Sequence, residues 1–237
     1  MKILYIFPHP DDESFGPALA ISRQKREGHQ VHLLTLTRGG ATRQREKLGL
    51  SVEEMGSIRF EEMRRMAEVV GLDSLEVLDF PDGGLAQLNP LKLERVLGDH
   101  LRDLRPSVIV TYPWHGISGH PDHLTTHAVV KRVFAAERIT GKGTELRRLA
   151  FFTLLPTGDC APKELSVSAE EDVDCLIAVD DADVERAESA LASYSTYEEV
   201  IREHDPLGRV GRRVAFEIFL ERHEPRLGSL TEKIESR

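Results

Sequence analysis

The sequence contains two His-Pro-Asp segments in which histidine and aspartate side chains are closely spaced. The first is His9-Pro10-Asp11-Asp12 and the second is His120-Pro121-Asp122-His123. Histidine nitrogens and aspartate oxygens are common ligands of catalytic zinc, which takes three protein ligands and keeps a fourth position open. Each segment could instead be a helix cap or a solvated loop, but their repetition favours one shared metal site.

Both segments follow apolar runs that are expected to be buried strands. Such runs predict strands over residues 2–7, 31–37, 75–80, 108–112 and 149–154, and periodic patterns predict helices over residues 17–27, 57–70, 90–104 and 121–137. This alternation predicts an α/β fold with a doubly wound, mostly parallel, Rossmann-like sheet and helices on both faces. In such a fold the ligand site lies beyond the carboxyl ends of the strands, where both segments are expected.

The rest of the chain gives weaker signals. A single domain is expected over residues 1–223, followed by a polar, flexible tail over residues 224–237. Residues 39–56 lack a clear period and are expected to form a lid or substrate loop. Beyond residue 156, an acidic helix is expected over residues 180–204 and a late strand or helix over residues 213–222.

Composition limits the expected partners. The chain has 31 basic and 40 acidic residues and a net charge of -9, which argues against binding to nucleic acid or to an anionic membrane. Cys160 and Cys175 are too few for a disulfide framework or a thiolate metal site. Without a targeting segment or an apolar run of ~18 residues, a cytoplasmic protein is expected. The composition does not decide whether the protein forms a homo-oligomer.

Neighbouring aspartates can serve different purposes in this pattern. His9, Asp12 and His123 offer a set of nitrogen and oxygen ligands, and Asp11 is then free to act as a general base. Zinc lowers the pKa of a bound water from ~15.7 towards ~7, which makes its deprotonation feasible. Asp11 could instead cap a helix. Zn²⁺ is the expected metal, and Fe²⁺ is possible because two histidines and one aspartate suit both ions.

Three segments taken together resemble the PIG-L/LmbE-like family of zinc-dependent N-acetylglucosaminyl deacetylases. They are His-Pro-Asp-Asp-Glu at 9–13, Phe-Pro-Asp-Gly-Gly-Leu at 80–85 and Gly-Ile-Ser-Gly-His-Pro-Asp-His at 116–123. The resemblance covers residues 1–155 and implies the same metal ligands and general base. It departs from the family pattern at residues 39–44, where the family often has an acidic residue and where the substrate pocket is shaped.

The resemblance also implies roles for further residues. His120 is expected to support the oxyanion as a cation, with Asp122 orienting or charging it. Arg59, which forms an Arg-x-x-Glu pattern with Glu62, is expected to contact substrate, and Asp82 is expected to hold sugar hydroxyls. On the residues alone, Arg59 and Glu62 could be a surface ion pair and Asp82 an ordinary turn residue.

The expected function is therefore metal-dependent hydrolysis. The substrate would be a small-molecule amino sugar, an N-acetylglucosamine-type conjugate that loses its acetyl group to an activated water. One alternative is an amidase that cleaves a larger acyl group from a thiol-sugar conjugate. Another is a non-catalytic, metal-binding Rossmann-like module, although no Gly-x-Gly-x-x-Gly segment follows the first strand to bind a nucleotide.

Overall fold

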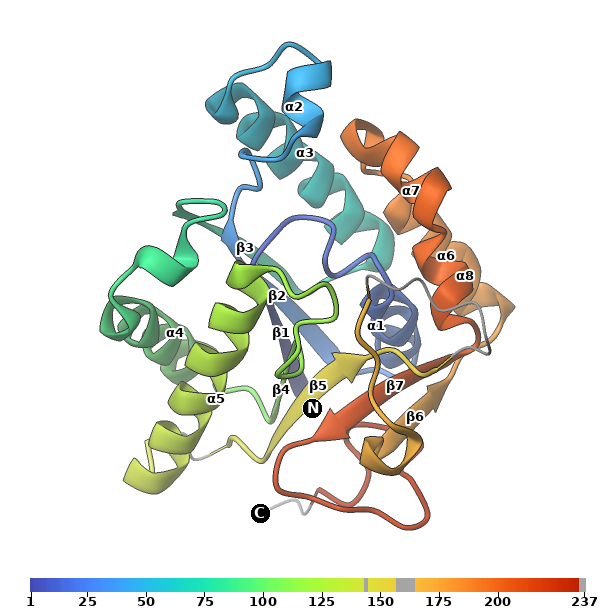
Figure 1. Ribbon diagram of the computed structural model, residues 1–237. Helices are drawn as coiled ribbons and strands as arrows, with labels where there is room; N and C mark the ends of the chain where they lie inside the picture. Colours follow the sequence, from blue (N-terminus) through green and yellow to red (C-terminus); the bar gives the residue numbers. More distant parts are fainter. Residues whose placement is uncertain (143–144, 157–164, 235–237) are drawn as a thin grey trace.

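A computed structural model of the protein describes residues 1–142, 145–156 and 165–234, and Cys160 lies outside these ranges. In this part of the chain seven strands form one sheet with the order β3-β2-β1-β4-β5-β7-β6 (Figure 1). They are β1 (Lys2–Phe7), β2 (Gln30–Thr37), β3 (Ser74–Phe80), β4 (Val108–Thr111), β5 (Arg148–Thr153), β6 (Cys175–Ala178) and β7 (Arg213–Ile218). The first five strands are parallel, and β7 runs antiparallel to β5 and β6.

Helices cover both faces of the sheet. The described helices are α1 (Pro17–Arg26), α2 (Gln44–Lys47), α3 (Val52–Val70), α4 (Pro90–Leu104), α5 (Pro121–Thr140), α6 (Asp181–Leu191), α7 (Glu198–His204) and α8 (Pro206–Val210). Short 3-10 turns occur at Leu85–Gln87, Glu170–Asp172 and Ser195–Tyr197. Among the described helices, none combines the length and apolarity needed to cross a membrane.

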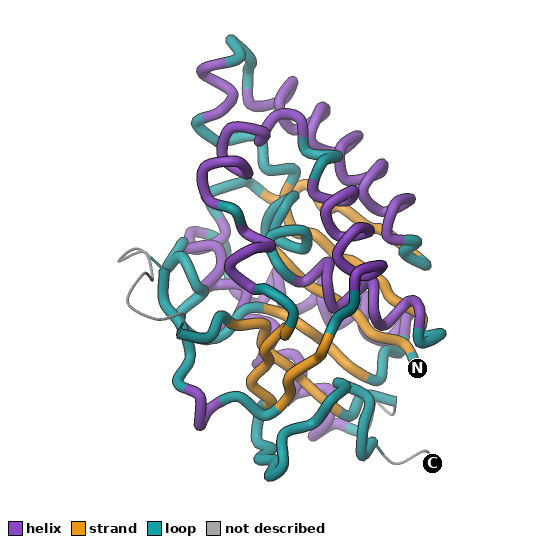
Figure 2. The backbone as a smooth tube through the Cα atoms, turned by 90° about the vertical axis from the view of Figure 1, so that its right-hand side faces the viewer, coloured by secondary structure: helices purple, strands orange, loops and turns teal. Residues whose placement is uncertain are grey.

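The core has one apolar layer on each side of the sheet. Ile3, Tyr5 and Phe7 of β1 point into the layer formed with α1, α3 and α6, while Leu4 and Ile6 point into the layer formed with α4 and α5. Side chains alternate between the two faces of a strand, so a strand covered on both sides must be apolar throughout. Figure 1 shows α4 and α5 on one side of the sheet, and Figure 2 views the molecule from the other side. The predicted doubly wound α/β fold is confirmed.

Several element boundaries differ from those expected. Helix α3 begins at Val52, within the expected loop over residues 39–56, because Ser51 and Glu54 form a reciprocal capping box. The expected helix over residues 180–204 is broken between α6 and α7, where the chain turns inward and buries Tyr194. The segment over residues 213–222 contains the strand β7, whereas β6 was not expected from the sequence.

The prediction of a flexible tail from residue 224 is wrong for the described residues 224–234. Leu227 and Leu230 are fully buried in the core. The main chain of Leu227 also bonds to Asp174 and Leu176 beside β6. The guanidinium of Arg148 on β5 donates to the carbonyl of Leu230 at 2.6 Å. Two apolar side chains and a buried cation therefore hold a segment whose overall composition is polar.

We predict that Leu230→Ala destabilises the protein. Removing a fully buried leucine side chain leaves a cavity, and such substitutions lower the free energy of unfolding by roughly 2–5 kcal/mol. Leu220→Ala is the matched control, because Leu220 is 87% exposed and its loss should change stability by less than about 0.5 kcal/mol. Urea unfolding followed by circular dichroism measures both, and equal midpoints would show that the segment is not part of the folded core.

Candidate metal centre and active site

The two His-Pro-Asp segments meet at the point where the strand order reverses. Strands β1 and β4 are neighbours, yet the connection after β1 leads to β2 on one side and the connection after β4 leads to β5 on the other. Their carboxyl ends therefore open a crevice between diverging loops, which is where doubly wound sheets bind ligands. The first segment leaves β1 and the second leaves β4 through Tyr112, so both contribute side chains to this crevice.

Asp12 contacts both expected histidine ligands, each through a different carboxylate oxygen. His9 Nδ1 lies 3.5 Å from Asp12 Oδ2, and His123 Nε2 lies 3.4 Å from Asp12 Oδ1. Tetrahedral zinc with bonds of about 2.0–2.1 Å places neighbouring ligand atoms roughly 3.3 Å apart. The ring of His120 also approaches, with its centroid 4.8 Å from that of His9. Among the described residues, two groups have donor atoms that all lie within 4.8 Å of one another, His9 with His120 and His123, and His9 with Asp82 and Asp122. Asp12 borders the first group through its contacts to His9 and His123 but does not belong to it.

Hydrogen bonds orient the two histidine ligands. His123 Nδ1 lies 2.9 Å from the carbonyl of Gly116, to which it donates, so the lone pair of Nε2 is available for a metal. Gly116 has a φ of +63°, and an added Cβ would lie 2.9 Å from the Cβ of His123, so glycine allows this close approach. His9 Nε2 lies 3.2 Å from the carboxylate of Asp122, which leaves Nδ1 facing Asp12.

Asp12 is held by the protein on both of its oxygens. Tyr112 donates its hydroxyl to Oδ1 at 2.7 Å, and the backbone N–H of His9 donates to Oδ2 at 2.9 Å. Burial disfavours the charged carboxylate, but the charges and hydrogen bonds of His123 and His9 hold the pKa of Asp12 well below its usual range. Asp12 is therefore an ionised, fixed oxygen donor.

The carboxylates around His9 make this position favourable for positive charge. Burial alone would lower the pKa of His9, but the carboxylates of Asp12, Asp122 and Asp82 raise it to about 10. The same carboxylates would stabilise a divalent cation placed among them.

Asp11 has a different environment from its neighbour. Its φ of 80° lies in the left-handed region, which is costly for an aspartate and is typical of functional turns. This conformation turns its carboxylate towards Arg59, whose Nη2 donates to Oδ2 at 2.5 Å. Burial raises the pKa of Asp11 and the charge of Arg59 opposes this, giving a value of about 7. Asp11 is therefore not a helix cap, and it has the pKa of a group that exchanges protons near neutral pH.

Arg59 and Glu62 do not form the surface ion pair that their spacing allowed. Arg59 is only 2% exposed, and besides Asp11 it donates to the carbonyls of Pro10 and Gly39. Its guanidinium also lies 4.2 Å from the ring centroid of Tyr197. Through its two terminal nitrogens Arg59 holds the turn around Asp11, while its Nε has no hydrogen-bond partner among the described residues and the side chain lines the cavity.

Glu62 is likewise buried and links α3 to the C-terminal part of the chain. Its Oε1 accepts from the hydroxyl of Ser195 and the backbone N–H of Thr196, each at 2.8 Å, and its Oε2 accepts from the hydroxyl of Thr196 at 2.7 Å. The Arg-x-x-Glu pattern therefore fastens α3 to two segments that are far apart in the sequence.

His120 and Asp122 lie beside the three ligands, but their relation differs from the expected one. Asp122 directs its carboxylate to His9 and to the backbone N–H groups of Gly83 and Leu85, not to the ring of His120. His120 Nδ1 instead accepts the backbone N–H of Asp122 at 3.1 Å. Burial and the charges of His9 and His123 lower the pKa of His120. The structure therefore favours a neutral His120 with its proton on Nε2, contrary to the expected cation.

Asp82 lies at the same edge of the site. Its Oδ1 is 3.3 Å from His9 Nε2, and its Oδ2 accepts the backbone N–H of Ala41 at 2.7 Å. Asp82 thus joins the loop after β2 to the turn that begins at His9. Its carboxylate lines the cavity that the two turns open into.

This cavity has a volume of about 790 Å³. The expected ligands, Asp11, His120 and Asp82 all line it, as do parts of residues 41–43 and 204–209. Asp122 belongs to the wall behind His9 rather than to the cavity lining. The volume is ample for a sugar with a substituent.

Three tyrosines that support the site were not singled out from the sequence. Tyr112 stacks on His123 with ring centroids 4.2 Å apart, besides bonding Asp12. Tyr194 donates to Glu13 at 2.7 Å, and Tyr197 covers Arg59. Only Tyr112 carries a signal in the sequence, its place at the end of an apolar run, since the other two come from a distant segment.

Comparisons with known proteins identify a family that this chain resembles. Residues 4–134 match the family model PIG-L, described as GlcNAc-PI de-N-acetylase. A deacetylase of 1D-myo-inositol 2-acetamido-2-deoxy-alpha-D-glucopyranoside from Thermomonospora curvata is 30% identical over 165 residues, which are 60% of this chain and 56% of the relative. A mycothiol S-conjugate amidase from Streptomyces coelicolor is 29% identical over 163 residues, or 61% of this chain and 55% of the relative.

The chain thus spans about half the length of the curated relatives it matches. A solved N,N'-diacetylchitobiose deacetylase from Pyrococcus horikoshii superposes with a TM-score of 0.70 at 19% identity, covering 92% of this chain and 83% of the other. At that identity the superposition shows the fold alone. The family model, however, covers more than half of the chain and includes both His-Pro-Asp segments, so the chain belongs to the PIG-L family of deacetylases.

Proposed function

We propose that the protein is a metal-dependent hydrolase that removes the acetyl group from an N-acetylglucosamine-type sugar conjugate. The observation that carries this proposal is the cluster of His9, His120 and His123, whose donor atoms lie within 4.8 Å of one another, with Asp12 in contact with His9 and His123 and Asp11 in the same cavity. Membership of the PIG-L family and the names of the relatives support acyl-amide hydrolysis on an amino sugar.

His9, Asp12 and His123 would hold the metal, and their donor types suit Zn²⁺ and also Fe²⁺. A bound divalent cation would supply Lewis-acid polarisation of the amide carbonyl and acidify water. Tyr112 and the carbonyl of Gly116 keep two of the ligands in place before any ion arrives. This preorganisation lowers the cost of assembling the site.

Asp11 would act as the general base. With a pKa of about 7, its carboxylate is ionised in a substantial fraction of molecules at neutral pH and can take the proton of the attacking water. The oxygen of that water then bonds to the acetyl carbon. When the carbon–nitrogen bond breaks, the proton on Asp11 can pass to the departing amine, so that acetate and a free amino sugar are formed and the carboxylate is regenerated.

His120 would stabilise the negative charge that develops on the carbonyl oxygen. Its Nδ1 accepts a backbone N–H, so the neutral ring carries its proton on Nε2 and can donate it as a hydrogen bond. Asp122 would act indirectly by orienting His9. We assign Arg59 to positioning Asp11, and Asp82 to holding a sugar hydroxyl at the cavity edge.

An amidase that removes a larger acyl group is the second candidate. The similarity to a mycothiol S-conjugate amidase favours it, and the same residues could perform the reaction. The two functions differ only in the size of the group attached to the carbonyl carbon.

We predict that the zinc-loaded protein releases acetate from N-acetylglucosaminides. A panel of such glycosides with different substituents is scored for free amine and for acetate, in parallel with glycosides that carry a larger acyl group on nitrogen. Faster turnover of the acetyl compounds supports the deacetylase, faster turnover of the larger amides supports the amidase, and inactivity on the whole panel would contradict both.

Metal content should separate ligands from base. His9→Ala and His123→Ala are each predicted to lose most of the bound metal, because a site with two ligands left binds weakly. Asp11→Asn should retain metal close to the wild-type ratio and lose about 10²- to 10⁴-fold in kcat. His100→Ala, which alters a histidine paired with Glu76 on the surface of α4, is the control. Elemental analysis after dialysis measures the metal bound per protein. Full metal retention in both histidine variants would refute the ligand set.

Arg59→Ala is predicted to change the pH dependence of the reaction. Because Arg59 lowers the pKa of Asp11, its removal should raise that pKa and move the rising limb of the kcat/KM profile to higher pH, with a loss of about 10²-fold at pH 7 from misplacement of the base. Arg59→Lys, which keeps the charge, should shift the limb less. Arg38→Ala, at an exposed ion pair with Asp79, serves as control. An unshifted limb in a folded, metal-loaded Arg59→Ala protein would exclude the positioning role.

A further inference from the structure

The cavity of the candidate active site contains basic side chains that the proposed chemistry leaves unused. Its acidic lining residues are engaged, since Asp11 pairs with Arg59 while Asp12 and Asp82 face His9. Arg43 and Arg209 line the same cavity. Within the described residues, neither guanidinium has a hydrogen bond or an ion pair.

We propose that Arg43 and Arg209 select a substrate that carries an anionic group, a carboxylate or a phosphate, attached to the amino sugar. This inference rests on the proposed deacetylase function and adds to it the chemical class of the substituent. A neutral sugar conjugate gives two guanidinium groups nothing to neutralise. An oxyanion can accept paired N–H donors from each of them, which is the recognition that guanidinium groups favour.

Neither arginine belongs to the three segments that carry the family resemblance. Arg43 lies in the segment 39–44, where the sequence departs from the family pattern, and Arg209 lies beyond the matched residues 4–134. The metal turns perform chemistry that is common to the family. Selection of a substituent is instead assigned to residues outside those turns.

Contacts between distant segments fix Arg43 opposite the C-terminal helices. The hydroxyl of Tyr197 donates to the hydroxyl of Thr42 at 2.5 Å, directly before Arg43. Lys47 at the end of α2 pairs with Glu199 on α7 at 2.8 Å. The loop that carries Arg43 is therefore joined to the segment that leads into Arg209, and both arginines belong to one connected rim.

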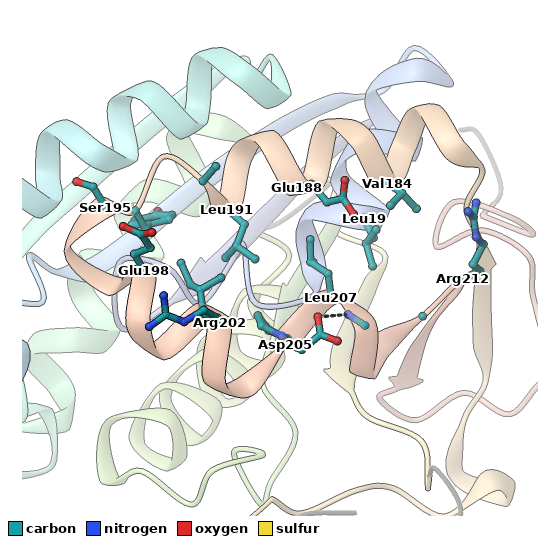
Figure 3. A pocket seen from close by; sticks show the side chains of 16 residues that line it. Leu19, Val184, Glu188, Leu191, Ser195, Glu198, Arg202, Asp205, Leu207 and Arg212 are labelled. Carbon is teal, nitrogen blue, oxygen red and sulfur yellow. Dashed lines mark hydrogen bonds between the residues drawn. The ribbon is translucent and has the colours of Figure 1, made fainter.

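A second cavity of about 690 Å³, shown in Figure 3, is lined in part by residues of α8. Pro206 lines both cavities, while Arg202 and Leu207 line only the second and Arg209 only the first. Asp205 accepts the backbone N–H of Gly208 at 3.2 Å and so caps the start of this short helix, as the dashed line in Figure 3 shows. Arg209, which is half-buried, lines the cavity of the candidate active site from this helix.

Overall charge makes a local basic site necessary for an anionic substrate. The chain has a net charge of -9, and the carboxylates at the metal site add negative potential inside the cavity. An anionic conjugate would be repelled unless unpaired cations lay near its charged end. Arg43 and Arg209 supply those cations. They are not paired with the carboxylates of the proposed metal site, and Asp11 pairs with Arg59 instead.

The test compares three acetylated substrates. They are methyl N-acetylglucosaminide, which is neutral, N-acetylglucosamine 1-phosphate, and the N-acetylglucosaminide of glycolic acid, which carries a carboxylate. We expect the zinc-loaded wild type to have a higher kcat/KM for at least one anionic substrate than for the neutral one. In the double variant Arg43→Ala/Arg209→Ala, the anionic-to-neutral ratio should fall about tenfold to a hundredfold, as for lost charged hydrogen bonds. The substrate that shows the fall identifies phosphate or carboxylate as the preferred group.

Arg202→Ala is the matched control, because it removes one positive charge from the same segment on the side of the second cavity. Its anionic-to-neutral ratio should match the wild type, and an equal fall there would assign the effect to general charge and overturn the inference. A double variant that keeps the wild-type ratio would also overturn it.

A binding measurement keeps this inference separate from the proposed function. Inactivity on all three substrates would contradict the deacetylase, but calorimetry with Asp11→Asn protein still reports binding of the two anionic sugars. Binding of either that weakens at least tenfold on adding Arg43→Ala and Arg209→Ala supports the inference. Binding that is absent from Asp11→Asn protein, or unchanged by the two substitutions, refutes it whatever the catalytic result.

Discussion

The adjacency of β1 and β4 at the reversal point of the sheet is the constraint on which the site depends. The chain leaves these neighbouring strands in opposite directions, so the loops beyond them diverge and cannot fill the space between their ends. Each loop must then satisfy its polar groups on the crevice side. The first does so with the turn around Asp11, and the second does so by starting α5 with His120 as its cap. The strand order therefore brings the imidazoles and carboxylates of the two loops to the same crevice.

Burying this much charge in one crevice requires a balance between neighbours. Asp12 can remain ionised because two histidines and two hydrogen-bond donors surround it. Asp11, one residue away, has one buried cation as its main partner and a pKa near neutrality. The left-handed backbone at Asp11 sends the two carboxylates to different partners. Identical side chains therefore acquire different proton affinities, which is what a ligand and a base next to each other require.

Local patterns were sufficient for the parts of the fold that depend on local physics. The parallel strands are apolar throughout because both faces are covered, and proline marks the starts of α1, α4 and α5. Two His-Pro-Asp segments at neighbouring strand ends likewise predicted that His9, Asp12 and His123 lie close together. Arg59 shows the limit of such reasoning, since its spacing to Glu62 suggests a surface pair while its real partners are 20 to 49 residues away. The tail was misjudged because two buried leucines decide its packing and composition averages over them.

The C-terminal segment has a larger part in the site than its weak pattern suggests. Tyr194 donates its hydroxyl to Glu13 in the turn that carries Asp11 and Asp12, Thr196 binds Glu62, and Tyr197 covers Arg59. Two of these contacts reach the turn, directly through Glu13 or by way of Arg59, which binds Asp11. The third joins the segment to α3, the helix that carries Arg59. The turn that carries Asp11 and Asp12 therefore depends on a segment at least 181 residues away in the chain, which local sequence patterns cannot predict.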